Sequence, residues 1–352
     1  MAQIRHDRDV EPPTLFVPGR LCLFGEHSDW AAALPGDAGI GSGACILTGT
    51  DQGITAHVSA ARDFEVTSAL PDGSRRGPFR VPMESQALRA AAAAGGFFSY
   101  AAGVAAVMRE IYGCGGIASR ARRCDLPLGR GLSSSAAVCV LTARALNRVH
   151  GLGLGIREEM ELAYRGELAA GSRCGRMDQA CAYGRQLVRL RFAGEAMDVD
   201  LLRAAQPLYL LVVDLQRSKD TRRILADLHR AFAEGGPIRA ALGADNLDLV
   251  GRASAALEAG DAPTVGALMS EAQELFDRVL APASPGLAAP RLHEVLAHAA
   301  GRELAWGGKG VGSQGDGAAQ FICRGPGERE ALASRLEADG MGSCLSVTIE
   351  PM

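Results

Sequence analysis

The segment that most constrains the fold is Pro127–Ala137, which reads Pro-Leu-Gly-Arg-Gly-Leu-Ser-Ser-Ser-Ala-Ala. Gly129 and Gly131 allow a tight turn and let the backbone approach an anion, because glycine carries no Cβ. Ser133–Ser135 then open an Ala/Val/Leu-rich stretch that predicts a helix over residues 134–149. The free N–H groups and positive dipole end of that helix would face a ligand. The segment predicts a phosphate site, although an ordinary glycine turn with a serine N-cap has the same pattern.

The length and charge of the chain favour a two-domain protein that acts on a small molecule. At 352 residues the chain is long for one hydrophobic core. Its 37 Lys and Arg residues against 40 Asp and Glu give a net charge of −3, and the charges are spread out rather than gathered in a basic tract. This distribution argues against nucleic acid as the main partner.

The cysteines and the N-terminus indicate the compartment. The nine cysteines are an odd number and form no Cys-x-x-Cys pair, which indicates reduced, mostly buried thiols rather than a disulfide frame or a zinc site. The N-terminus has no apolar signal core, and no apolar run approaches the roughly 20 residues of a membrane span. We therefore expect a cytoplasmic protein with no membrane contact.

The pattern of apolar residues predicts a flexible polar tail, residues 1–13, followed by two domains. The N-terminal domain, 14–205, has predicted strands at 15–17, 21–24 and 54–58 and predicted helices at about 86–112, 134–149 and 156–169. The C-terminal domain, 206–352, has predicted strands at 208–213, 318–323 and 345–349 and predicted helices around 219–233, 248–259 and 263–281.

A second segment, Pro18–Trp30, combines a predicted strand with charges at both ends; it reads Pro-Gly-Arg-Leu-Cys-Leu-Phe-Gly-Glu-His-Ser-Asp-Trp. Arg20 stands at one end, and Glu26, His27 and Asp29 form an acidic cluster at the other. Carboxylates and imidazole accept from or donate to neighbouring hydroxyls, which suits polyol recognition. A solvated turn is the alternative. A metal site is not expected, because no second group of ligands stands nearby at helical spacing.

A third segment, Gly171–Gln179, follows a predicted helix whose apolar stripe contains Ile156, Met160, Ala163, Tyr164 and Leu168. Glu167 falls on that stripe, almost two helical turns after Met160. Its carboxylate should point inward, where a charge needs a cation or hydrogen-bond donors. A Mg²⁺ ion would meet that need.

The three segments, in this order, resemble the GHMP kinase superfamily, named for galactokinase, homoserine kinase, mevalonate kinase and phosphomevalonate kinase. Pro18–Trp30 is similar to the galactokinase-type signature, and Pro127–Ala137 to the phosphate loop of the family. Lys309–Gly317 resembles the third glycine motif, and Phe98–Val104 more weakly resembles the segment that helps to enclose adenine. The resemblance implies an α+β, two-domain fold with ATP and the substrate in the interdomain cleft.

The resemblance also implies a role for each matching residue. Asp178 would face the reactive hydroxyl, as a base or as an orienting group, and Arg20 would stabilise charge at the transferring phosphoryl group. The residues implied in substrate binding are Glu26, His27, Asp29 and Gly175. Those implied in nucleotide binding are Gly129, Arg130, Gly131, Leu132, Ser133, Ser134, Ser135, Tyr100 and Gly312. Ser135 and Glu167 would bind Mg²⁺.

Two features depart from the family pattern, and the role of one further segment stays open. Glu167 precedes Asp178 by a spacing similar to that of mevalonate kinase, whereas galactokinases place this glutamate one residue earlier, where the chain has Gly166. Gln314 replaces a glycine that is usual in the third motif. The charged stretch Arg217–Arg223 is either a substrate contact or a solvated helix start.

The sequence supports three other functions less well than a kinase. Gly310-x-Gly312-x-x-Gly315 satisfies a dinucleotide fingerprint, but a predicted strand follows it where a helix is required. A serine hydrolase would need a Gly-x-Ser-x-Gly elbow. A catalytically inactive sugar-binding regulator is disfavoured by the retained Arg20 and Asp178. The sequence predicts an ATP- and Mg²⁺-dependent kinase of a sugar, with the anomeric hydroxyl one candidate position, and leaves a mevalonate-type or other polyol or amino-alcohol acceptor open.

Overall fold

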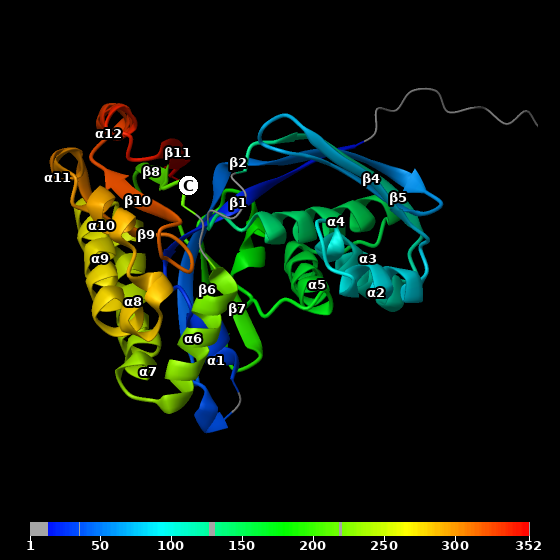
Figure 1. Cartoon of the computed structure of the whole chain (residues 1–352), viewed down its shortest axis with the longest axis horizontal. Helices are drawn as coiled ribbons and strands as arrows, with labels where there is room; N and C mark the ends of the chain where they lie inside the picture. The colour runs from blue at the N-terminus through cyan, green and yellow to red at the C-terminus, as the bar shows by residue number, and fades with distance from the viewer. Residues whose placement is uncertain (1–12, 35, 127–130, 218–219, 352) are drawn as a thin grey trace, which may run out of the picture. The chain divides into compact units, whose positions relative to one another are not determined.

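The computed structural model describes residues 13–34, 36–126, 131–217 and 220–351 (Figure 1). The predicted tail up to residue 12, Gly129 and Arg130 lie outside these residues. The chain forms two compact units, described separately here. Unit 1 holds the chain up to Val17, Gly53–Asp125 and Val138–Ser172, and unit 2 holds Pro18–Gln52, Leu126–Ala137 and the chain from Arg173. The predicted domain boundary near residue 205 stays a prediction.

Unit 1 combines a sheet with helices. Its strands run in the order β4 (Arg75–Val81), β3 (Phe64–Ala69), β5 (Gly116–Cys124) and the C-terminal part of β2 (Gly43–Ala61). β3 and β5 are parallel, and the other neighbours are antiparallel. The helices gather on one face of these strands: α2 (Ser85–Ala93), α3 (Ser99–Tyr112), most of α4 (Ser134–His150) and α5 (Ile156–Ala169) (Figure 1).

Helices α3 and α5 pack closely because glycines stand at their contact. A Cβ added to Gly103 would lie 2.2 Å from the carbonyl oxygen of Gly166, and one added to Gly166 would lie 2.3 Å from Val104 Cγ2. No side chain fits at position 166 without moving α3. A buried carboxylate of α5 stands one residue later, at Glu167, which is 3% exposed.

Unit 2 contains two groups of strands. In the first, β1 (Thr14–Phe24) pairs with β2, and β2 continues to β6 (Val188–Ala193) and β7 (Ala196–Leu201). The second is an antiparallel sheet in the order β11 (Ser343–Ile349), β8 (Leu208–Asp214), β10 (Ala318–Cys323) and β9 (Ala305–Gly310). β1 and β2 each run from one unit into the other.

The helices of unit 2 mostly follow β8 in the chain. They are α1 (Ser28–Ala33), α6 (Thr221–Glu234), α7 (Pro237–Leu242), α8 (Ala244–Ala259), α9 (Ala262–Leu275), α10 (Pro290–Leu296), α11 (Ala299–Leu304) and α12 (Pro326–Ala338). α9 packs against β9 so closely that a Cβ on Gly307 would lie 2.0 Å from the carbonyl oxygen of Gly266.

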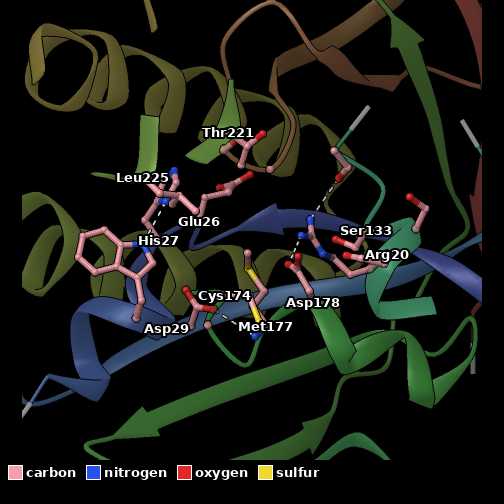
Figure 2. A pocket seen from close by; sticks show the side chains of 17 residues that line it. Arg20, Glu26, His27, Asp29, Ser133, Cys174, Met177, Asp178, Thr221 and Leu225 are labelled. Atoms are coloured by element: carbon pink, nitrogen blue, oxygen red, sulfur yellow. Dashed lines mark hydrogen bonds and ion pairs between the residues drawn. The ribbon is translucent and has the colours of Figure 1, made fainter. Parts of the chain in front are cut away.

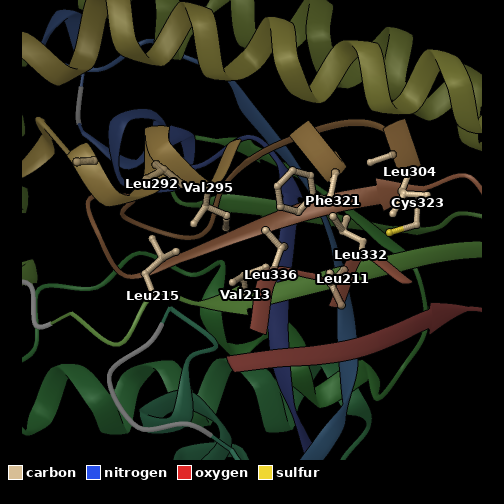
Figure 3. Packing of buried hydrophobic residues seen from close by; sticks show 14 residues of the cluster. Leu211, Val213, Leu215, Leu292, Val295, Leu304, Phe321, Cys323, Leu332 and Leu336 are labelled. Atoms are coloured by element: carbon tan, nitrogen blue, oxygen red, sulfur yellow. The ribbon is translucent and has the colours of Figure 1, made fainter. Parts of the chain in front are cut away.

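One face of the antiparallel sheet carries an apolar core (Figure 3). Leu211 of β8 lies opposite Phe321 of β10, so both side chains leave the same face. Helices α10 and α12 cover them with Leu292 and Leu336. Full burial of each such side chain contributes about 1.5–3 kcal/mol, so this core fixes the frame that carries the third glycine motif.

The structure confirms several predicted elements and corrects others. The helices predicted at 134–149 and 156–169 are α4 and α5. The single helix predicted over 86–112 is wrong, because Gly95 and Gly96, with φ of 73° and 89°, separate α2 from α3. The predicted stripe of α5 is also partly wrong, since Ile156 and Leu168 are 44% and 39% exposed. Within the described part of the chain, no helix is long and apolar enough to cross a membrane.

Candidate active site

A cavity of about 200 Å³ in unit 2 brings together the predicted motifs (Figure 2). Its walls come from four segments, residues 20–30, 131–135, 174–178 and 312–313, together with Thr221 and Leu225. The structure thus gathers side chains that lie far apart in the sequence.

Arg20 is the central cation of the cavity. Strand β1 places it so that it is 3% exposed, and its backbone N–H donates to Leu132 O at 3.0 Å. Its Nη2 donates to Asp178 Oδ1, and its Nη1 donates to Gly131 O at 3.4 Å. Burial alone would lower the pKa of Arg20. The neighbouring acidic groups, Asp178 first among them, together raise this pKa by more, so it lies above its usual range. Arg20 therefore stays charged and connects the first motif, the phosphate loop and Asp178.

One N–H of the Arg20 side chain has no partner among the described residues. It belongs to Nε, which is buried. A buried guanidinium N–H without an acceptor is costly, which makes an anion beside it favourable.

Asp29 faces the same cavity from α1, and it is 5% exposed. Its Oδ2 accepts a hydrogen bond from the backbone N–H of Met177 at 3.1 Å. A Cβ added to Gly175 would lie 1.8 Å from that oxygen, so a glycine is required there. Burial, followed by the negative charge of Asp178, raises the pKa of Asp29 to about 6.

His27 is held by Trp30. The Trp30 indole Nε1 donates to His27 Nδ1 at 3.2 Å. Because an indole nitrogen can only donate, Nδ1 acts as the acceptor and the ring carries its proton on Nε2. Trp30 itself stacks on His229 at a centroid distance of 4.0 Å and meets Phe232 edge-on at 5.4 Å.

Glu26 lies in the cavity wall but is already paired. Lys309 Nζ donates to Glu26 Oε1, and the side chains of Lys309 and Glu26 are 1% and 7% exposed. The sequence implied a substrate contact for Glu26 and no role for Lys309. A lysine within the predicted third motif was the available signal, since a buried lysine needs a partner.

The phosphate loop and the third glycine motif touch each other. Gly131 and Gly312 have φ of 83° and 63°. A Cβ on Gly312 would lie 3.3 Å from Gly131 O, and a Cβ on Gly131 would lie 3.2 Å from Val311 O. Ser133, with φ of 55°, follows in the same loop, and α4 begins at Ser134. Backbone and hydroxyl groups of both motifs thus face one cavity.

The sequence of this chain also matches the model of a known protein family over part of its length. Residues 99–185 match the family model described as "GHMP kinases N terminal domain". This part of the chain is therefore similar to the N-terminal domain of the GHMP kinases. The GHMP kinases phosphorylate hydroxyl groups of their substrates.

Solved GHMP kinases share the fold over nearly the whole chain. Mevalonate kinase of L. major in complex with R-mevalonate has 18% identity and a TM-score of 0.70, over 96% of each chain. Lactococcus lactis galactokinase complexed with galactose has 16% identity and a TM-score of 0.70, over 98% of this chain and 94% of that chain. Homoserine kinase from Cytophaga hutchinsonii has 17% identity and a TM-score of 0.66, over 99% and 98%.

These likenesses confirm the predicted α+β fold of the GHMP kinases. At identities this low they do not define the acceptor. None of the curated proteins compared with the chain matches it.

Gln314, in the predicted third motif, adopts a backbone conformation that suits a glycine. Its φ is 59°, in the left-handed region that a glycine would adopt freely. Its side chain is 2% exposed and lies against Gly310, where an added Cβ would be 2.7 Å from Gln314 Oε1. The Gln314 side chain therefore fills space beside Gly310.

Two predicted site residues lie in unit 1. Tyr100 is half-buried on α3, and Glu167 is buried on α5. Their assignments to the nucleotide and the metal stay predictions. Within the described part of the chain, no group of three or more His, Cys, Asp and Glu side chains is arranged to hold a metal.

The charged stretch around residue 220 is both a helix start and a cavity wall. Asp220 caps α6 by accepting from the Arg223 backbone N–H at 3.0 Å, and Arg222 and Arg223 are exposed. Thr221 faces the cavity instead. Asp220 therefore starts a helix and Thr221 lines the cavity, while a substrate contact in this stretch stays a prediction.

Proposed function

We propose that this GHMP kinase transfers the γ-phosphoryl group of ATP to a hydroxyl of a sugar or sugar derivative. The observation that carries the proposal is the cavity in which Asp178, Arg20 and Asp29 meet the first turn of α4 (Figure 2). A carboxylate, a paired guanidinium and an anion-binding helix start are the parts that phosphoryl transfer requires.

The residues around the phosphate loop fit a magnesium nucleotide. Gly131 and Gly312 leave space that a Cβ would fill, and Arg20 Nε has no partner among the described residues. The hydroxyls of Ser133–Ser135 line the same cavity. ATP with Mg²⁺, when bound, supplies the phosphoryl group and neutralises its charge. Ser135 would contribute a hard oxygen ligand, and we propose Glu167 as the second.

The acceptor hydroxyl would be oriented by Asp178. Its side chain is 26% exposed in the cavity, so a substrate can reach the carboxylate. The carboxylate accepts the hydrogen bond of the hydroxyl and draws its proton away as the new bond forms. Arg20 holds Asp178 in place and stabilises charge at the transferring group. Asp29 and His27 would hydrogen-bond other hydroxyls of the same substrate.

The charge of the cavity favours a neutral polyol over a carboxylate-bearing alcohol. Among the described residues that line it, the cationic side chain is Arg20, and Asp178 occupies it. The Asp29 carboxylate, which accepts from the Met177 backbone N–H, would repel an acceptor carboxylate. The fold does not distinguish a neutral polyol from a carboxylate-bearing alcohol, since the structures with galactose and with R-mevalonate both have a TM-score of 0.70.

An acceptor screen tests the proposal. ADP release would be measured with ATP, Mg²⁺ and each of a panel of monosaccharides, amino sugars, mevalonate and homoserine, and NMR of the product would locate the phosphate. We expect turnover with a sugar, with the anomeric hydroxyl as the first candidate. Turnover with mevalonate or homoserine, and with no sugar, would contradict the proposed acceptor.

A further inference from the structure

A buried ion pair connects the acidic loop of the cavity, Glu26–Asp29, to the third glycine motif. Lys309, on β9, extends its ammonium to Glu26 Oε1 and to Gly310 O at 3.1 Å. The two partners are separated by 283 positions in the sequence. The pair therefore joins the end of β1 to the edge strand of the second sheet.

The backbone N–H and the carbonyl oxygen of Gly310, the residue after Lys309, both make hydrogen bonds. Its N–H donates to Gln273 Oε1 at 2.7 Å. Gln320 Nε2 approaches its carbonyl oxygen at 3.5 Å and donates to Cys22 O on β1 at 2.7 Å. Lys309 thus projects from a hydrogen-bonded frame, and its ammonium holds Glu26 against that frame.

The loop that Glu26 opens needs such support. Gly25 and His27 both have positive φ, 94° and 69°. A residue other than glycine in this region is strained and persists only where its surroundings determine it. Ser28 Oγ donates to Gly25 O at 2.9 Å, Trp30 holds the His27 ring, and Lys309 holds Glu26.

We propose that Lys309 is a positioning residue: by neutralising Glu26 and holding it away from the acceptor, it sets His27 and Asp29 in their binding orientation. The expected effect on acceptor binding rests on the proposed function, whereas the expected effect on the loop does not. Glu26 is then a structural partner of Lys309 rather than a ligand of the substrate, which revises the role that the sequence implied for it.

Electrostatics predict how the pair responds to mutation. Removing one partner leaves a buried charge without compensation, whereas replacing both by neutral groups of similar shape is often tolerated. In Lys309→Met, the free Glu26 carboxylate would turn into a cavity that already contains Asp29 and Asp178. In the double variant Glu26→Gln/Lys309→Met, that excess charge is gone.

The first readout needs no substrate. The sequence has two tryptophans, so Trp306→Phe leaves Trp30 as the single indole reporter. In this background, Lys309→Met should shift the ¹H–¹⁵N signal of the Trp30 indole, which hydrogen-bonds to His27. Lys309→Arg and the double variant should restore it largely to the wild-type position.

Arg144→Met provides a matched control. It breaks another buried pair, in which Arg144 Nε lies 2.8 Å from Glu159 Oε2, with side chains 20% and 7% exposed. This variant should lower the melting temperature without moving the Trp30 signal. A loss of stability alone is thereby separated from a loss of loop position.

The second readout is kinetic, with whichever acceptor the wild type phosphorylates. Lys309→Met should lower kcat/KM for the acceptor by roughly tenfold or more, chiefly through its KM, while the double variant recovers most of the loss. The positioning role is wrong if Lys309→Met leaves both the Trp30 signal and the acceptor KM unchanged, or if the double variant is as impaired as Glu26→Gln. Should no sugar be phosphorylated, the acceptor proposal fails, while the indole signal still decides the role of Lys309.

Discussion

At the scale of single residues, the candidate site depends on how charges are paired. Arg20 holds Asp178, Lys309 holds Glu26, and Asp29 is buried with backbone N–H donors alone. Burial consequently raises the pKa of the Asp29 carboxyl to about 6. Its position depends on Gly175, since no other residue leaves space for its carboxylate.

The raised pKa of Asp29 predicts a pH-dependent stability. Folding raises this pKa from 3.8 to about 6, so the native state binds the proton more tightly than the unfolded chain. The stability from this group is complete below pH about 4 and is lost as the pH rises through about 6, a change of about 3 kcal/mol. Urea unfolding of wild type and Asp29→Asn at pH 4, 5, 6 and 7 measures it. Parallel stability curves for the two proteins would show that Asp29 titrates normally.

Gly175→Ala tests the space beside Asp29. The added Cβ would lie 1.8 Å from Asp29 Oδ2, so the carboxylate must move. We expect the acceptor KM to rise by roughly tenfold and the KM for ATP to stay similar. Gly251→Ala on α8, where an added Cβ meets nothing within 4 Å, is the control and should leave both constants unchanged. Equal kinetics for Gly175→Ala and wild type would remove Asp29 from the acceptor site.

At the scale of elements, glycine contacts decide where side chains can stand. The close approach of α3 and α5 excludes a side chain at position 166 and leaves Glu167 as a buried carboxylate of α5. Glu161 on the same helix is only half-buried. The two glutamates therefore form a natural pair for testing the metal assignment.

Glu167→Gln should weaken activation by Mg²⁺ much more than Glu161→Gln does. A buried carboxylate supplies the hard oxygen that Mg²⁺ prefers, and an amide oxygen without charge binds it less well. Mg²⁺ would be titrated at saturating ATP in both variants, with melting temperatures to confirm folding. If Glu167→Gln requires no more Mg²⁺ than wild type, another group binds the metal.

The elements also show what the sequence could and could not predict. The helix after the phosphate loop was predictable, because its serine start and its Ala/Val/Leu pattern are local. Strand β9 was not predicted, because Gly307, Gly308 and Gly310 have low strand propensity. Those glycines are explained by the close approach of α9, and the Lys309–Glu26 pair by a fold that joins distant segments. Neither the helix–strand contact nor the ion pair can be predicted from the spacing of residues along the sequence.

At the scale of the whole molecule, motifs far apart in the chain meet in one cavity of unit 2. The motifs were enough to predict a resemblance to the GHMP kinases; residues 99–185 match the model of their N-terminal domain, and solved GHMP kinases at identities of 16–18% share the fold. The acceptor was not predictable in the same way, because it depends on which charges of the cavity are paired. Burial and pairing appear only when the chain is folded.

The central claim is that phosphoryl transfer takes place beside Asp178, and Asp178→Asn tests it most directly. The carboxylate lies in the cavity and is held by Arg20, so its loss should lower kcat by roughly 10² or more while nucleotide binding stays nearly intact. Turnover would be followed by release of ADP with the acceptor found in the screen, and nucleotide affinity by calorimetry on the folded variant. A folded Asp178→Asn protein that binds ATP and turns over at the wild-type rate would contradict the account.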